Sequence, residues 1–263
     1  MVTCLGDALY PEVGESVVTV LRNLGVTVDF PAGQTCCGQP AFNSGYVDDA
    51  RRSARAFIDA FEGSEHVVSI SGSCAAMVRH HYPVLFPAGR DHARAEALAA
   101  RTWEFSQFLT DVLGVEELPV TYRAVATLHH SCHTLRMLGV REGPERLLGM
   151  VGGLEYRPLP RAQDCCGFGG TFAVKMAAIS GELVDRKVDN VLASGAGLLV
   201  GLDMSCLMNI GGRLRRRGSR VVVKHLAQVL AEGWRLQAGG RRAPAGFAAN
   251  GAGGAAGVAG AGR

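Results

Sequence analysis

The stretch Cys36-Cys37-Gly38-Gln39-Pro40 occurs a second time in the chain, as Cys165-Cys166-Gly167-Phe168-Gly169-Gly170. Each adjacent cysteine pair is accompanied by one cysteine far upstream and one far downstream, at closely matching distances along the sequence. All eight cysteines therefore fall into a first set and a second set, namely Cys4, Cys36, Cys37 and Cys74, and Cys132, Cys165, Cys166 and Cys206. Random placement would not produce this pattern, so the sequence predicts two copies of a four-thiolate site on a duplicated scaffold.

The composition, with 48% hydrophobic and 19% charged residues, is typical of a soluble globular protein. No segment approaches the roughly 18–20 apolar residues that span a bilayer, and Asp7 and Glu12 interrupt any signal peptide. We therefore expect a cytoplasmic protein without a membrane span. Clustered cysteines in a reducing compartment more often bind metal or carry redox chemistry than form disulfides. The net charge of +3 equals the three arginines after Ala238, so the body is nearly neutral and nucleic-acid binding is not expected.

Short apolar runs predict strands at 26–30, 66–70, 122–128, 154–159, 198–202 and 220–224. The longest predicted helices between and after them are 46–61, 133–150 with an interruption near Gly143-Pro144, 172–193 and 226–236. Strands that alternate with helices indicate βαβ units and parallel sheets. We therefore predict an α/β fold of two tandem repeats, each a small parallel sheet flanked by helices. The predicted parts are a first repeat at 1–87, a helical connector at 88–118, a second repeat at 119–237 and a disordered Gly/Ala-rich tail at 238–263.

Ligands of parallel sheets bind beyond the carboxyl ends of the strands. Each cysteine element is expected to follow a strand, which would let distant cysteines meet at one edge. The first repeat departs from this plan, because only Met1-Val2-Thr3 precede Cys4, whereas a full strand precedes Cys132. We expect either a true start several codons upstream, or a lost first strand and a weakened first site.

Four thiolates are soft ligands that suit zinc or an iron–sulfur cluster. Structural zinc sites usually contain C-x-x-C knuckles, which this sequence lacks. Adjacent cysteines point in different directions and reach a polynuclear centre more easily than one small ion. The spacing thus favours an iron–sulfur cluster in at least one set, with zinc possible in one site. Eight resting thiols without metal are the plain alternative, which the duplication disfavours.

The sequence resembles the cysteine-rich CCG-domain family over about residues 3–236. This family includes the CCG-domain component of heterodisulfide reductase, the glycolate-oxidase iron–sulfur subunit and proteins of lactate utilization. The stretches that carry the resemblance are Tyr10-Pro11-Glu12-Val13-Gly14, Gln34-Thr35-Cys36-Cys37-Gly38-Gln39-Pro40-Ala41-Phe42-Asn43-Ser44-Gly45, Ser71-Gly72-Ser73-Cys74-Ala75-Ala76-Met77-Val78-Arg79, His130-Ser131-Cys132-His133, Leu135-Arg136, Cys165-Cys166-Gly167-Phe168-Gly169-Gly170-Thr171-Phe172 and Asp203-Met204-Ser205-Cys206-Leu207-Met208.

The resemblance implies that both cysteine sets are ligands of iron–sulfur clusters, of the 4Fe-4S kind. It implies an electron-transfer component of a multi-subunit system that oxidises L-lactate to pyruvate. The implied partners are a ferredoxin-type iron–sulfur subunit and a third lactate-utilization protein.

One departure from the family pattern bears on the reaction. In the CCG-domain component of heterodisulfide reductase each motif closes with C-x-x-C, whereas here Met77 and Asn209 occupy the last positions. A five-cysteine cluster cannot form as it does there, which disfavours direct disulfide chemistry. Two alternatives remain: a CCG-type reductase subunit that acts directly on a disulfide or oxo-acid, and a zinc–thiolate assembly or scaffold subunit.

Several polar residues are further candidates, although no catalytic residue is predicted. His129, His130 and His133 bracket Cys132. They could donate to cluster sulfide, carry protons or contact a carboxylate, or they could only cap a helix or face solvent; His130 and His133 are preferred. Arg136 and Lys175 could bind an α-hydroxy acid carboxylate or an acidic partner, or be ordinary surface charge. The basic run at 213–220 suits a solvated helix end or a partner-docking surface.

Overall fold

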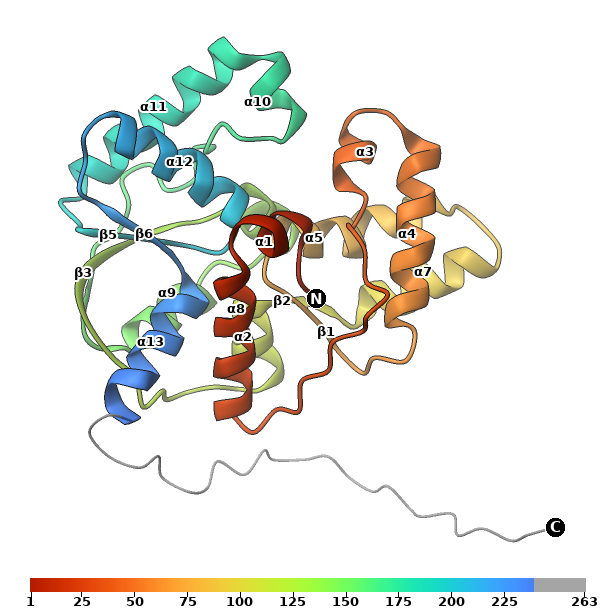
Figure 1. Cartoon of the computed structure of the whole chain (residues 1–263), viewed down its shortest axis with the longest axis horizontal. Helices are drawn as coiled ribbons and strands as arrows, with labels where there is room; N and C mark the ends of the chain where they lie inside the picture. Colours follow the sequence, from red (N-terminus) through yellow and green to blue (C-terminus); the bar gives the residue numbers. More distant parts are fainter. Residues whose placement is uncertain (239–263) are drawn as a thin grey trace, which may run out of the picture.

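The computed structural model describes residues 1–238 and confirms an α/β fold with two parallel sheets flanked by helices (Figure 1). The smaller sheet has the order β1-β2, and the larger has the order β4-β3-β5-β6. Every strand pair in both sheets is parallel. The predicted tail lies outside the described residues apart from Ala238, the last residue of α13.

The first half of the chain carries short strands and many short helices. Its elements are α1 (Cys4–Leu9), α2 (Pro11–Asn23), α3 (Gln39–Asn43), α4 (Val47–Phe61), β1 (Val67–Ser69), α5 (Gly72–Ala76), η1 (Met77–His81), α6 (Tyr82–Leu85), α7 (Arg90–Ala100), β2 (Thr102–Glu104), α8 (Phe105–Gln107) and η2 (Phe108–Val112).

The second half carries the larger sheet. Its elements are β3 (Thr121–His129), η3 (His133–Met137), α9 (Gly143–Gly149), β4 (Gly152–Tyr156), α10 (Thr171–Lys175), α11 (Ala177–Ala193), β5 (Leu198–Gly201), α12 (Met204–Arg216), β6 (Val222–His225) and α13 (Leu226–Ala238).

The register of the larger sheet aligns the ends of three strands. His129 at the end of β3 lies beside Gly201 of β5, and Gly201 lies beside His225 of β6. In β5, from Leu198 to Gly201, every residue is buried, as expected of a central parallel strand covered on both faces. The chain leaves this edge toward Cys132 and Cys206, so the sheet brings the outer members of the second set together.

Two apolar cores hold the molecule together, and they do not follow the repeats. The smaller core joins α4 to the helices around η1, with Phe57, Met77 and Tyr82 fully buried. The larger core lies around the four-stranded sheet and also takes in Val13, Val17 and Val20 of α2. Figure 1 shows α2 beside α13 in the lower part of the molecule. An early helix therefore ties the first half to the second.

Three sequence predictions differ from the structure. Residues 26–30 form no strand, because their counterpart β4 pairs with β3 while residues 1–3 form no strand that could pair with them. The vicinal pair of the first set consequently follows irregular chain. The stretch 88–118 is not purely helical, since β2 lies inside it and pairs with β1. The predicted helix 172–193 is two pieces, α10 and α11, whereas the interruption predicted near Gly143-Pro144 is present between η3 and α9.

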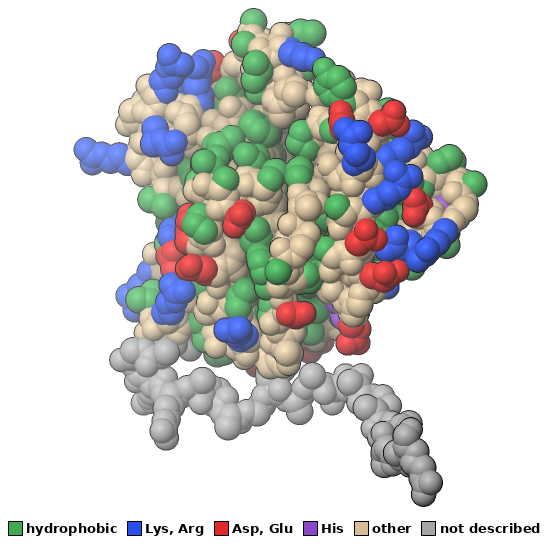
Figure 2. Space-filling model, turned by 45° about the vertical axis from the view of Figure 1, so that its right-hand side comes forward, with side chains coloured by type: hydrophobic (Ala, Val, Ile, Leu, Met, Phe, Trp, Pro, Cys, Tyr) green, Lys and Arg blue, Asp and Glu red, His purple; other side chains and the backbone are tan. Residues whose placement is uncertain are grey.

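On the face that Figure 2 shows, most Lys, Arg, Asp and Glu side chains lie toward the two sides, and mainly hydrophobic and neutral side chains lie between them. Among residues 1–238, no helix has both the length and the apolar character that crossing a membrane requires.

Candidate metal centre

The first cysteine set converges from three short elements. Cys4 opens α1, Cys74 lies in α5, and the pair Cys36-Cys37 comes directly before α3. The sulfurs of Cys4 and Cys36 are 3.7 Å apart, and those of Cys37 and Cys74 are 3.4 Å apart. The four thiols are unbridged and close enough to bind one centre.

The second set repeats this arrangement on the larger sheet. Cys132 follows β3, Cys206 lies in the first turn of α12, and Cys165-Cys166 precede α10. The thiols of Cys132 and Cys166 lie close enough to the Cys165 sulfur to lower its pKa. The backbone N–H of Gly167 also donates to that sulfur, at 3.3 Å. Burial matches between the sets, because in each the last two cysteines are buried and the first two are more exposed.

The two vicinal pairs share one backbone turn. Gly38 has φ 82° and Gly167 has φ 81°, a left-handed conformation that favours glycine. A Cβ on Gly167 would also lie 2.6 Å from the carbonyl oxygen of Ser180 in α11. The carbonyl of the second cysteine in each pair accepts a side-chain hydrogen bond: the Tyr82 hydroxyl donates to the Cys37 carbonyl, and the Asn209 amide donates to the Cys166 carbonyl.

Asn209 and Met77, at the positions where the heterodisulfide reductase component has its further cysteines, each make a structural contact. Asn209 anchors the backbone of the second vicinal pair at 2.8 Å from the Cys166 carbonyl oxygen. Met77 is fully buried in the smaller core. Each set therefore offers four thiols and no fifth.

The charge distribution of the thiols is the same in both sets. Hydrogen bonding with Cys37 and Cys4 lowers the pKa of Cys36, and hydrogen bonding with Cys132 and Cys166 lowers the pKa of Cys165. The pKa values of these neighbouring thiols rise, chiefly because of the same hydrogen bonds and because they are partly desolvated. The first cysteine of each vicinal pair is thus the preferred thiolate, the form that binds metal.

Both sets open onto one cavity of about 140 Å³. Its lining includes Cys4, Cys37 and Cys74 of the first set and all four cysteines of the second. The remaining lining side chains are mostly small or apolar, with Asp203 as the one carboxylate and no lysine or arginine among them. The duplicated motifs therefore form one composite site rather than two remote ones.

Asp203 joins the two halves at this cavity. One of its carboxylate oxygens accepts from the Ser71 hydroxyl at 2.7 Å and from the Ser73 backbone N–H at 3.0 Å. The other accepts from the backbone N–H and hydroxyl of Ser205. Burial alone would raise the pKa of Asp203, but the bonds from Ser205, Ser73 and Ser71 outweigh it and lower the pKa. A buried anion thus links the segments that carry Cys74 and Cys206.

The predicted polar residues occupy different places. His133 lines the cavity, with its Nδ1 3.7 Å from the Cys132 sulfur and its Nε2 3.4 Å from the Gln39 amide nitrogen. His130 turns away and bonds with Glu145 at 3.1 Å.

The predicted cations do not line the cavity. Arg136 is exposed and donates to the Gln163 carbonyl, and Lys175 is exposed at the end of α10. In the basic run, Arg213 and Arg217 form ion pairs with Asp185 and Asp189 of α11, so these two charges tie helices together.

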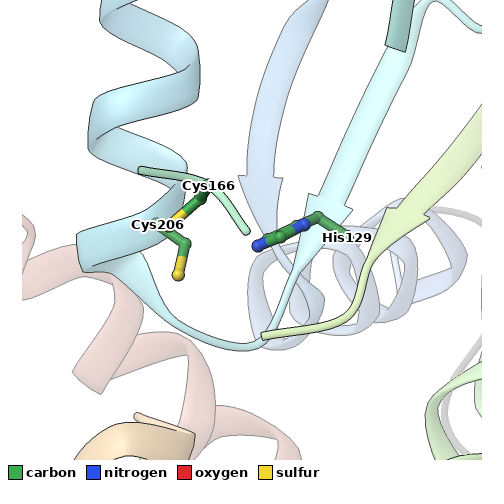
Figure 3. Close-up of side chains that lie close together, drawn as sticks. All are labelled: His129, Cys166 and Cys206. Atoms are coloured by element: carbon green, nitrogen blue, oxygen red, sulfur yellow. The ribbon is translucent and has the colours of Figure 1, made fainter. Parts of the chain in front are cut away.

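Two buried groups near the second set were not among the preferred candidates. His129 is 1% exposed, and Figure 3 shows its ring pointing toward Cys166 and Cys206. Lys187 is fully buried and donates to the carbonyls of Arg161 and Ala162, in the segment that leads to Cys165. Lys187 lies on the face of α11 that carries Val184, Val188 and Val191, and this apolar spacing in the sequence could have predicted that the lysine is buried.

The donors present fit a soft metal centre. Each set supplies four unbridged thiols, and in the second set the ligand atoms of His129, Cys166 and Cys206 all lie within 4.8 Å of one another. Thiolate sulfur and imidazole nitrogen are the ligands of zinc and of iron–sulfur clusters. The buried His129 nitrogens have no hydrogen-bond partner in the described chain, which leaves them available for a metal.

Comparisons with known proteins agree with the site. The family model described as "Cysteine-rich domain" (CCG) matches residues 1–79 and 126–211, the two segments that carry the cysteine sets. "Lactate utilization protein A 2" of Bacillus cereus (strain Q1) is 52% identical over 233 residues, which cover 88% of this chain and 96% of that protein. "Lactate utilization protein A 1" of Bacillus anthracis (strain CDC 684 / NRRL 3495) is 51% identical, with the same coverage. "Lactate utilization protein A 1" of Bacillus mycoides (strain KBAB4) is 52% identical over 88% of this chain and 95% of that protein. The chain thus belongs to the CCG cysteine-rich domain family, as its motifs predict.

Proposed function

We propose that this protein is an iron–sulfur electron-transfer component of a multi-subunit system that oxidises L-lactate to pyruvate. The observation that carries the proposal is the composite site, in which two four-cysteine sets open onto one cavity. The relatives named for lactate utilization supply the metabolic setting. When bound, an iron–sulfur cluster supplies reversible one-electron transfer.

The residues around the cavity suit electron transfer better than direct lactate oxidation. An α-hydroxy acid carboxylate is usually held by a cation, and no lysine or arginine lines the cavity. The carboxylate of Asp203 would repel such a substrate. The backbone N–H of Gly167 donates to the Cys165 sulfur, which is a means of tuning a thiolate-bound centre. Lactate would accordingly be oxidised on a partner subunit.

The proposed partners are a ferredoxin-type iron–sulfur subunit and a third lactate-utilization protein. An apolar surface beside the second set suits such contacts, because Val174, Met176 and Ile179 are 82%, 53% and 55% exposed. Val174 lies on α10, Ile179 lies on α11 and Met176 links the two helices, and Thr171 at the start of α10 lines the cavity. Exposed apolar patches of this kind commonly mark interaction sites.

Anaerobic purification tests the proposal most directly, with iron, zinc and acid-labile sulfide analysis and electron paramagnetic resonance. We expect iron, sulfide and a signal that lactate reduces only after the partner subunits are added. Cys37→Ser and Cys166→Ser should each abolish the signal of their own set. Stoichiometric zinc without acid-labile sulfide would contradict the proposal and favour the zinc–thiolate scaffold. Reduction by lactate without partners would favour a directly acting reductase subunit.

A further inference from the structure

The buried imidazole of His129 has no function in the fold that its surroundings explain. Its side chain is 1% exposed, and neither ring nitrogen has a hydrogen-bond partner among the described residues. A buried polar group without a partner is destabilising, so such a group calls for a ligand. In the neighbouring His130, by contrast, Nε2 bonds with Glu145 and only Nδ1 lacks a partner among the described residues.

The surroundings of His129 identify the ligand as a metal. His129 ends β3, and its ring points at the sulfurs of Cys166 and Cys206, which come from two other segments (Figure 3). The three ligand atoms lie within 4.8 Å of one another and all three residues are buried. A neutral imidazole and two thiolates at this separation are the start of a soft metal site.

We propose that His129 is a fifth protein ligand of the metal centre in the second set, beside its four cysteines. The inference rests on the proposed function, since it takes the second set to bind metal. The first set has no matching donor: the residue three positions before Cys4 is Met1, which packs against the smaller core. The two sets, alike in cysteines, therefore differ in ligand chemistry.

The two centres would also differ in the charge around them. A neutral imidazole added beside four thiolates leaves the net charge of the second centre equal to that of the first, so this ligand alone does not raise the reduction potential. The buried ammonium of Lys187 adds positive charge on the same side, because it lies close enough to Cys165, Cys166 and Cys206 to interact with them. The second centre would be the more easily reduced and would accept electrons from the first.

X-ray absorption at the edge of the bound metal, together with pulsed electron paramagnetic resonance, tests the ligand assignment. The full chain is purified anaerobically as wild type, as His129→Gly and as His130→Gly. We expect a metal–nitrogen shell and a strong nitrogen hyperfine coupling that are lost in His129→Gly and kept in His130→Gly. Added imidazole should restore both signals in His129→Gly, which separates a lost ligand from a damaged fold.

Each other result decides against the inference. A wild-type centre with sulfur ligands only would overturn it and leave the proposed function standing. Nitrogen signals that persist in His129→Gly and vanish in His130→Gly would assign the ligand to the neighbour. Protein that holds no metal in any preparation would overturn the inference and the proposed function together. A histidine that only hydrogen-bonds to a thiolate would give no metal–nitrogen shell, which again counts against the assignment.

Discussion

The contact between Gly72 and Thr134 sets how closely the two halves pack beside the composite site. Gly72 opens α5 two residues before Cys74, and Thr134 lies in η3 two residues after Cys132. A Cβ on Gly72 would lie 1.8 Å from the Thr134 Oγ1 and 3.1 Å from its Cβ. The backbone N–H of Gly72 also donates to the Leu202 carbonyl across the same interface, at 3.4 Å. Gly72→Ala should therefore push the cysteine sets apart.

The expected loss of stability follows from two opposing effects. Overpacking a buried contact costs about 1–3 kcal/mol, and 1.8 Å places this clash at the upper end. Removing the flexibility of glycine in the unfolded chain returns about 0.4–1 kcal/mol. The net destabilisation of Gly72→Ala should be about 2 kcal/mol. Thr134→Ala alone should cost less than about 1 kcal/mol, because its buried hydroxyl has no hydrogen-bond partner in the described chain.

A double-mutant cycle in urea, followed by circular dichroism on reduced metal-free protein, measures this contact. With Thr134→Ala the 1.8 Å clash disappears, so the double variant should lie within about 1 kcal/mol of wild type and show a coupling above about 1 kcal/mol. Gly181→Ala in α11 is the matched control, because nothing lies within 4 Å of its Cβ, and it should stabilise by about 0.5–1 kcal/mol. Additive single-variant effects, or an unchanged Gly72→Ala, would refute the described packing of the halves.

Three further predictions address charge and partner contact. Burial raises the pKa of Glu104 from 4.5 to about 7, so between these pH values the folded state holds a proton that the unfolded state has lost, and the free energy of unfolding should fall by roughly 3 kcal/mol as the pH rises through them. Glu104→Gln should flatten this pH dependence in urea titrations at about pH 4.5 and 8. An unchanged slope in the variant would contradict the prediction. Lys187→Met keeps the packing but leaves the carbonyls of Arg161 and Ala162 without their donor, which should cost about 1–3 kcal/mol in thermal unfolding. Because it also removes a positive charge, the second centre should become harder to reduce in a redox titration. An unchanged potential would argue against that electrostatic role. Val174→Asp should weaken partner-dependent reduction several-fold without changing the metal content. Val222→Asp, at another exposed valine, is the control. Equal effects of the two variants would show that α10 is not the docking surface.

The fold class and the two cysteine sets follow from the order of the amino acids alone. Two vicinal cysteine pairs with matching partners indicate a duplication, and the strand–helix alternation around them predicts parallel sheets. Gly38 and Gly167 follow the pairs because the turn requires positive φ, which a local sequence can encode. These features depend on neighbours in the chain, so one sequence was enough to find them.

The way in which the pieces combine depends on contacts between distant segments. Whether 26–30 forms a strand depends on a pairing partner elsewhere, and none is present in the described chain. That both sets share one cavity depends on the packing of Gly72 against Thr134 and on the bonds of Asp203 to Ser71 and Ser73. His129 and His130 are adjacent in sequence, yet at the end of β3 the first lies beside Cys166 and Cys206 and the second bonds with Glu145. Tertiary contacts decide which of the two histidines lies beside the thiols, and the local sequence does not contain that choice.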